Sequence, residues 1–138
     1  MSVVLDTHVW LWLINGDARL GSNTKSRIEA EAKERGVVVS AITPWEISLL
    51  VTKGRLSLPR PIYIWLTDYL SHPGVFLHPL TVSIAVDCND LPAEIHSDPA
   101  DRILIATARE LQAPLVTADR KILDYAACGH LDALNAEH

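Results

Sequence analysis

The sequence is poor in cysteine, and the cysteines that it has are poorly placed for structural chemistry. Cys88 and Cys128 form no CxxC spacing and stand beside no pair of histidines. Neither a zinc site nor a disulfide framework is therefore indicated. We expect both cysteines to be small core residues.

Positive charge is also scarce, since 12 Lys and Arg residues stand against 17 Asp and Glu residues, for a net charge of −5. Binding of nucleic acid over a broad basic face depends on counterion release by many Lys and Arg side chains. The composition argues against that mode. Any nucleic acid must bind at a local site where the negative charge of the protein is neutralised.

Long apolar runs are missing as well. The longest one, "VWLWLI", is far shorter than the roughly 20 residues that cross a bilayer. The start of the chain, "MSVVLD", lacks the basic segment of a signal peptide. We expect no membrane partner and a cytoplasmic location. A chain of 138 residues with 49% hydrophobic residues can bury one substantial core, which predicts a single domain over residues 1–138.

Short β-rich runs alternate with longer helical patterns along the whole chain. This alternation predicts an α/β fold, with a central parallel sheet covered by helices on both faces. The tail, residues 131–138, would either add a last edge strand or fray. The expected strands are 3–6, 37–41, 75–80 and 114–119, and the expected helices are 7–14, 23–35, 44–53, 61–71, 81–90, 99–112 and a short one after residue 119.

Acidic residues recur where an expected strand leads into an expected helix. Asp6 ends the first strand, and Asp119 follows the fourth, where it would cap the short helix. Glu46 and Asp101 lie in the first turns of the third and sixth expected helices. These junctions gather on one edge of an open parallel sheet, which is also where ligands bind. The geometry could bring the four carboxylates together.

Glu46 has two readings in the stretch "SAITPWEISLL". Thr43 before a proline predicts a capped helix start, and Glu46 three residues later could reach back to the cap backbone. The helix continues through Leu49 and Leu50, so Glu46 also shares their apolar stripe. We predict that Glu46 is a ligand that faces the other acids, and not a cap.

The sixth expected helix, in "HSDPADRILIATA", carries two acids with different roles. Asp101 begins a stripe that continues through Leu104 and Ala108 and should face inward. Asp98 stands just before a proline, so we expect it to cap the helix or to support the site from outside the ligand set. His96 is either an ordinary loop histidine or a substrate contact.

Each acid alone has an ordinary reading, because Asp is a favoured N-cap and acids suit the first turn of a helix. Together they present a different problem. Several ionised carboxylates within a few ångströms repel one another, and a divalent cation relieves that repulsion. Hard oxygen ligands favour Mg²⁺ or Mn²⁺ over zinc.

Four separated motifs, in this order, cover nearly the whole chain and together resemble a PIN domain, most of all the VapC-like toxins of bacterial toxin–antitoxin modules. Any one of these motifs alone would be weak, but their agreement is specific. They are "VVLDTHVWLW", "SAITPWEISLL", "HSDPADRILIATA" and "LVTADRKI".

The resemblance implies a three-layer α/β/α sandwich and a metal-dependent endoribonuclease site. The family's acids, which hold one or two Mg²⁺ or Mn²⁺ ions and activate a water for attack on RNA, fall on Asp6, Glu46, Asp101 and Asp119. Thr117 matches a hydroxyl position near the metal, or is simply a β-branched strand residue. The resemblance also implies an RNA substrate, a cognate antitoxin protein and a homodimer.

Some cationic and aromatic residues remain open to two readings. Arg102, Lys53, Arg55 and Arg60 are either contacts for RNA phosphates or solvated surface charges. The four tryptophans could stack on bases, but their apolar surroundings favour core, interface or partner-groove positions. They are Trp10, Trp12, Trp45 and Trp65.

Two other functions remain as alternatives. The chain could be a PIN-fold binding module with little turnover, because carboxylates at helix starts suit a basic partner side chain as well as a metal. Asp6 at the end of the first strand also allows an aspartyl-phosphate phosphatase, but such sites commonly place a second Asp two residues on, where this chain has His8.

Overall fold

A computed structural model describes residues 2–95 and 97–138; His96 and its alternatives lie outside these ranges. Helices and strands alternate along the described chain as the sequence predicts, and most element ends fall within two residues of the expected ones. The elements are β1 (Val3–Leu5), α1 (Thr7–Asn15), α2 (Ser22–Glu34), β2 (Val37–Ser40), α3 (Ile42–Thr52), α4 (Ile62–Leu70), β3 (Val75–His78), α5 (Val82–Asp87), α6 (Pro99–Leu111), β4 (Leu115–Thr117), α7 (Arg120–Ala127) and β5 (Ala133–Asn135).

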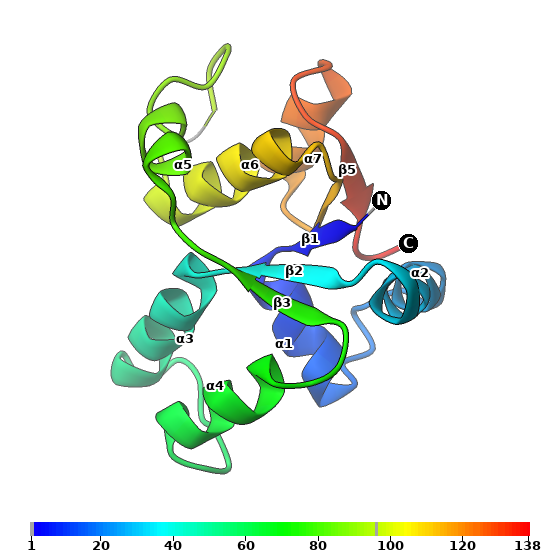
Figure 1. Cartoon of the computed structure of the whole chain (residues 1–138), viewed down its shortest axis with the longest axis vertical. Coiled ribbons are helices and arrows are strands. Elements are labelled where there is room, and N and C mark those ends of the chain that lie inside the picture. Colours follow the sequence, from blue (N-terminus) through cyan, green and yellow to red (C-terminus); the bar gives the residue numbers. More distant parts are fainter. Residues whose placement is uncertain (1, 96) are drawn as a thin grey trace.

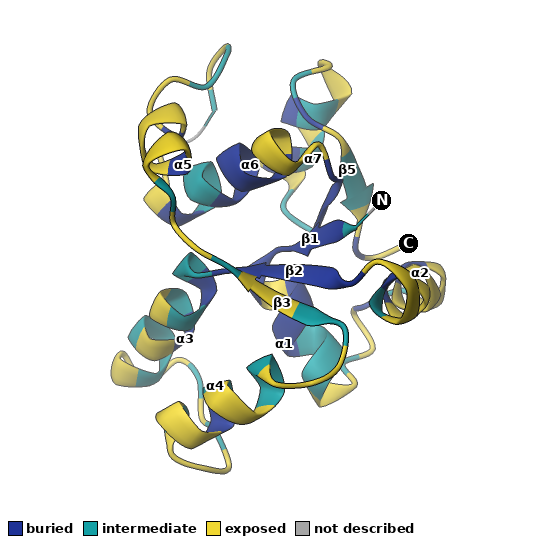
Figure 2. Ribbon diagram, in the orientation of Figure 1, coloured by how far each residue is buried: buried dark blue, intermediate teal, exposed yellow. Residues whose placement is uncertain are grey.

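The strands form one parallel sheet in the order β3-β2-β1-β4-β5. β1 is central, and Val4 pairs with Val38 on one side and with Leu115 on the other. Every residue of β1, β2 and β4 is buried, which explains why these strands are apolar except for the last residues of β2 and β4, Ser40 and Thr117 (Figure 2). Of the two readings of the C-terminal tail, the edge strand is the one observed, as β5.

Helices cover both faces of the sheet, so the predicted three-layer α/β/α sandwich is confirmed (Figure 1). On one face, α1 to α4 pack through a cluster that includes Trp10, Ile28 and Trp65. On the other face, α6 and α7 pack through a second cluster that includes Ile105 and Ile122. Within the described ranges, no helix combines the length and the apolar character needed to span a membrane.

The predicted cap at Thr43 is wrong. α3 begins two residues earlier than expected, at Ile42, after Ala41, which has no side-chain acceptor, and the Ile42 amide donates instead to Ser40 Oγ at 3.1 Å. Thr43 is fully buried inside the helix. Its hydroxyl lies 2.9 Å from the Thr7 hydroxyl of α1 and does not cap its own helix. As a result Glu46 lies just beyond the first turn.

One further expectation fails, for a single cysteine, and the tryptophans divide between the positions expected for them. Cys88 is buried as expected, but Cys128 is exposed, because it follows α7 at the surface. Trp45 is 57% exposed, whereas Trp10 and Trp65 are buried and meet edge to face with ring centroids 5.8 Å apart. The tryptophans thus divide between core and surface according to which side of a helix each one occupies.

Candidate functional site

The predicted site acids lie on the edge of the sheet at which the strands end. Asp6 directly follows β1, and Asp119 stands between the adjacent strand β4 and α7. Glu46 follows β2 on α3, and Asp101 is in the first turn of α6. Local sequence signals place each acid at a junction, and the parallel order of the strands then brings the junctions together.

Asp6 is the most deeply buried of these acids, at 7% exposure. Burial raises its pKa from the ordinary 3.8, a hydrogen bond from Thr117 opposes that rise, and the charge of Asp119 adds to it. Thr117 Oγ1 donates to Asp6 Oδ2 at 2.7 Å and accepts the Asp119 amide at 3.0 Å. Thr117 therefore joins the first predicted ligand to the last one.

The Glu46 carboxylate is close enough to Asp6 to feel its charge, and it is held by a residue that sequence reasoning missed. Thr7 Oγ1 donates to Glu46 Oε1 at 2.5 Å. Burial raises the pKa of Glu46, the hydrogen bond from Thr7 lowers it, and the charges of Asp6 and Asp98 raise it. The position of Thr7 directly after Asp6, as the first residue of a helix, was the signal that could have identified it.

The pKa of Asp101 is affected by the charges of the other acids of the site. Its pKa is raised from 3.8 to about 8, first by burial and then by the negative charges of its acidic neighbours. Those neighbours, in order of effect, are Asp6, Asp98, Asp119 and Glu46. The site is thus one electrostatic unit and not a set of separate helix starts.

Asp98 and Asp119 serve as caps in addition to facing the site. Asp98 is exposed and accepts the amides of Ala100 and Asp101 through Oδ1, at 2.9 and 3.2 Å, which is the capping role that the sequence predicts. Asp119 accepts the Lys121 amide at 2.8 Å and likewise caps α7. The two caps fix where α6 and α7 begin relative to the sheet.

The donor set suits a hard divalent cation, because every group is a carboxylate or hydroxyl oxygen. Burial and then the negative charges of the neighbouring acids raise the pKa of Asp101, and a cation would oppose both effects. As the side chains lie, however, residues 2–95 and 97–138 include no group of three or more His, Cys, Asp or Glu side chains that could hold a metal ion. The oxygen donors are of the kind that such a cation prefers, but the side chains in the described ranges are not spaced so that three or more of them could hold one.

The residues that are candidates for binding RNA phosphates differ in their hydrogen bonds, ion pairs and exposure. The Arg102 guanidinium donates through Nε to the Cys88 carbonyl at 2.8 Å and through Nη1 to the Ile95 carbonyl at 3.5 Å, so it holds the segment before α6. Arg60 pairs with Asp68 at 2.7 Å. Lys53 and Arg55 are exposed in the loop after α3. Arg102 therefore has a structural role that the sequence did not indicate.

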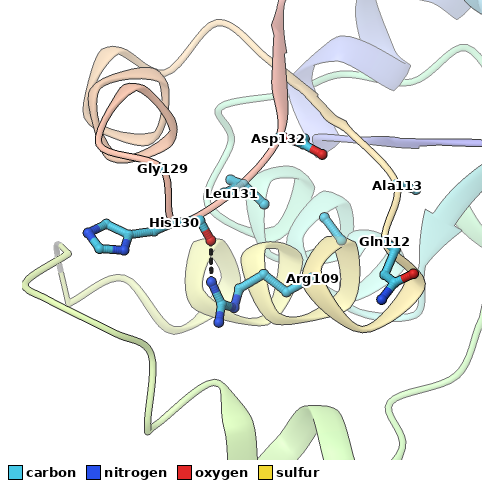
Figure 3. A pocket seen from close by; sticks show the side chains of 8 residues that line it. Arg109, Gln112, Ala113, Gly129, His130, Leu131 and Asp132 are labelled. Carbon is cyan, nitrogen blue, oxygen red and sulfur yellow. Dashed lines mark hydrogen bonds between the residues drawn. The ribbon is translucent and has the colours of Figure 1, made fainter.

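A hollow of about 420 Å³ lies elsewhere, between the end of α6 and the segment before β5 (Figure 3). Arg109 spans it and donates to the His130 carbonyl. α6 begins at the acidic site and runs for 13 residues, or roughly 20 Å at 1.5 Å per residue. The hollow is at the other end of that helix and contains none of the site acids.

A family model and a known protein each match most of this chain. A family model described as the PIN domain matches residues 3–127. Ribonuclease VapC22 from Mycobacterium tuberculosis is 36% identical over 121 residues, which cover 88% of this chain and 89% of that protein.

Two solved structures share the fold. VapBC2 from Rickettsia felis, bound to a DNA fragment from its promoter, matches with a TM-score of 0.72 and 18% identity over 98% of both chains. A toxin–antitoxin complex from Klebsiella pneumoniae matches with a TM-score of 0.64 and 20% identity over 97% of both chains. At these identities the match concerns the fold alone.

Proposed function

This chain belongs to the PIN-domain family, and on that premise we propose that it is a metal-dependent endoribonuclease and the toxin of a bacterial toxin–antitoxin module. The observation that carries the proposal is Asp101, a partly buried carboxyl group whose pKa is raised to about 8, first by burial and then by the charges of four acidic neighbours. A divalent cation bound among these carboxylates would relieve their mutual repulsion.

We propose that Asp6, Glu46, Asp101 and Asp119 hold one or two Mg²⁺ or Mn²⁺ ions. We infer that these carboxylates draw together when a cation binds, because the cation relieves their mutual repulsion. When bound, the ions supply activation of a water and neutralisation of charge at the phosphate. Thr117 and Thr7 hold Asp6 and Glu46 in orientation through their hydroxyl groups.

RNA is the proposed substrate, and its phosphates would contact cations beside the acids. Lys53 and Arg55 are exposed in the loop after α3 and suit that role. Arg102, already bonded to two carbonyl oxygens, has N–H groups left for a phosphate but is primarily a holding group. We propose the cytoplasm as the location, because the proposed RNA substrate is found there.

A cognate antitoxin is the proposed protein partner. The support is a structure of the same fold, since the Klebsiella pneumoniae structure is described as a toxin–antitoxin complex. We also propose that two copies of this chain associate. The support for this is apolar exposure, which includes Val82 at 83%, Tyr63 at 77% and Val86 at 60%.

The nuclease is tested with structured RNA, Mg²⁺ or Mn²⁺, and EDTA. Asp6→Asn should lose at least about 100-fold in cleavage rate, because even outer partners of a metal ligand are worth 10- to 100-fold. Asp90→Asn removes an exposed carboxylate outside the site and should cleave as the wild type does. Equal cleavage by wild type and Asp6→Asn, or cleavage that persists in EDTA, would contradict the proposal.

The binding-module alternative is separated by Mn²⁺ calorimetry. A nuclease of the proposed kind takes up Mn²⁺ in a way that depends on Glu46 and Asp101. A module that receives a basic partner segment shows no such uptake, and its acids then serve only to bind that segment.

A further inference from the structure

Two buried threonines form a hydrogen-bonded chain that ends on Glu46. Thr43 Oγ1 and Thr7 Oγ1 are 2.9 Å apart, and Thr7 Oγ1 is 2.5 Å from Glu46 Oε1. Both threonines have 0% exposure. We call this hydrogen-bonded pair of threonines, Thr43 and Thr7, the threonine relay.

The relay runs in one direction. A hydroxyl group has one proton to donate, and an ionised carboxylate can only accept. The Thr7 proton goes to Glu46, so the bond between the threonines must be donated by Thr43 and accepted by Thr7. Because both side chains are fully buried, bulk water does not compete for either proton.

The relay joins two elements that carry different acids. Thr7 is the first residue of α1 and follows Asp6, while Thr43 lies one turn before Glu46 on α3. The bond from Thr7 to Glu46 spans 39 residues of sequence. The position of Glu46 relative to Asp6 is therefore set by this link between α1 and α3 and not by the helix that carries Glu46 alone.

We propose that Thr43 and Thr7 are positioning residues that preset one oxygen of Glu46, so that the carboxylate meets an incoming divalent cation already oriented toward Asp6. This inference rests on the proposed metal site. Outer hydrogen-bond partners of this kind orient metal ligands and are generally worth 10- to 100-fold in affinity or activity.

A purely structural role would have a different consequence. Buried hydroxyl groups need partners in any case, and two threonines bonded to each other would satisfy that need. Their loss would then change stability and leave metal affinity unchanged. Metal affinity, measured beside stability, separates the two roles.

The test uses variants that keep the shape of the side chain. Thr43→Val removes the hydroxyl from a β-branched residue of the same size, and Thr43→Ser restores it. Thr107→Val is the matched control, because Thr107 is 1% exposed and its hydroxyl donates to the Ile103 carbonyl within α6. Mn²⁺ affinity is measured by calorimetry, and stability without metal by thermal unfolding.

Thr43→Val should weaken Mn²⁺ binding by about 10-fold, Thr43→Ser should recover most of it, and Thr107→Val should bind as the wild type does. When Glu46→Gln is already present, Thr43→Val should have no further effect on Mn²⁺ affinity. Wild-type affinity in Thr43→Val, or an equal loss in Thr107→Val, would overturn the proposal.

A second measurement tests the hydrogen bonds of the threonine relay in the absence of any metal. In metal-free protein labelled with ¹³C at the glutamate carboxyl carbon, the Glu46 resonance is assigned by its absence in Glu46→Gln. Both Thr7→Val and Thr43→Val should shift it. If the wild type takes up no Mn²⁺, the metal site fails, and unshifted Glu46 resonances in the two variants would refute the relay itself.

Discussion

Asp101 illustrates how strongly its surroundings can change a single side chain. The sequence places it in the first turn of a helix, where a carboxylate is ordinarily favourable because of the helix dipole. The structure surrounds it with Asp6, Asp98, Asp119 and Glu46 and raises its pKa from 3.8 to about 8. In a site of this charge, burial and repulsion outweigh the dipole.

This pKa predicts a pH-dependent cost in stability. Between about pH 4 and pH 8 the folded protein holds the Asp101 proton more tightly than the unfolded chain does, so the free energy of unfolding falls as pH rises through that window. Asp101→Asn removes the effect. In EDTA, its urea midpoint should exceed that of the wild type by more at pH 8 than at pH 5. The control Asp90→Asn should show no such trend, and an equal gain at both pH values would contradict the prediction.

At the scale of elements, the packing of helices against the sheet depends on close backbone approaches. Gly74, between α4 and β3, has a φ of +83°, and a Cβ atom there would lie 2.1 Å from the Ala32 carbonyl oxygen of α2. Its own carbonyl accepts the Val37 amide at 2.7 Å. This glycine allows α2 and the starts of β2 and β3 to meet at one point.

Gly74→Ala should therefore destabilise the fold by more than conformation alone explains. We expect a loss on the order of 3 kcal/mol, because strain at positive φ adds to a clash with backbone that cannot move cheaply. Gly54→Ala is the control, since Gly54 has a φ of +71° with nothing within 4 Å of a Cβ atom, and should cost about 1 kcal/mol. Urea unfolding measures both losses, and similar values would show that the contact with α2 relaxes easily.

At the scale of the whole molecule, the surface carries both excess negative charge and exposed apolar side chains. The net charge is −5, so RNA binding has to be local. On α5, Val82 and Val86 are one turn apart and therefore share a face, with exposures of 83% and 60%. This apolar helix face is a candidate interface.

We predict that the chain self-associates through this face of α5. Sedimentation equilibrium should give twice the 15.2 kDa mass of one chain, and Val86→Asp should shift the equilibrium toward single chains because it places a charge in an apolar contact. Asn89→Asp adds the same charge just beyond α5 and should leave the mass unchanged. A wild type that sediments as single chains, or two variants that behave alike, would refute the prediction.

The sequence by itself determined the order of elements, the parallel α/β architecture and the junctions at which the acids stand. These features follow from apolar runs, helical periodicity and caps, and each depends on residues only a few positions apart. Asp98 and Asp119 cap α6 and α7 as their positions predict. Thr43 was misassigned as a cap because its true partner, Thr7, is 36 residues away.

Only the tertiary structure decided how the acids are held and how they influence one another. The bond from Thr117 to Asp6 spans 111 residues, and the one from Thr7 to Glu46 spans 39. Likewise, only the packed structure shows that Arg102 holds a loop, that Cys128 is exposed and that the Asp101 pKa rises. Hydrogen-bond partners, burial and charge neighbours depend on which elements meet in space, and no local pattern in the sequence encodes that.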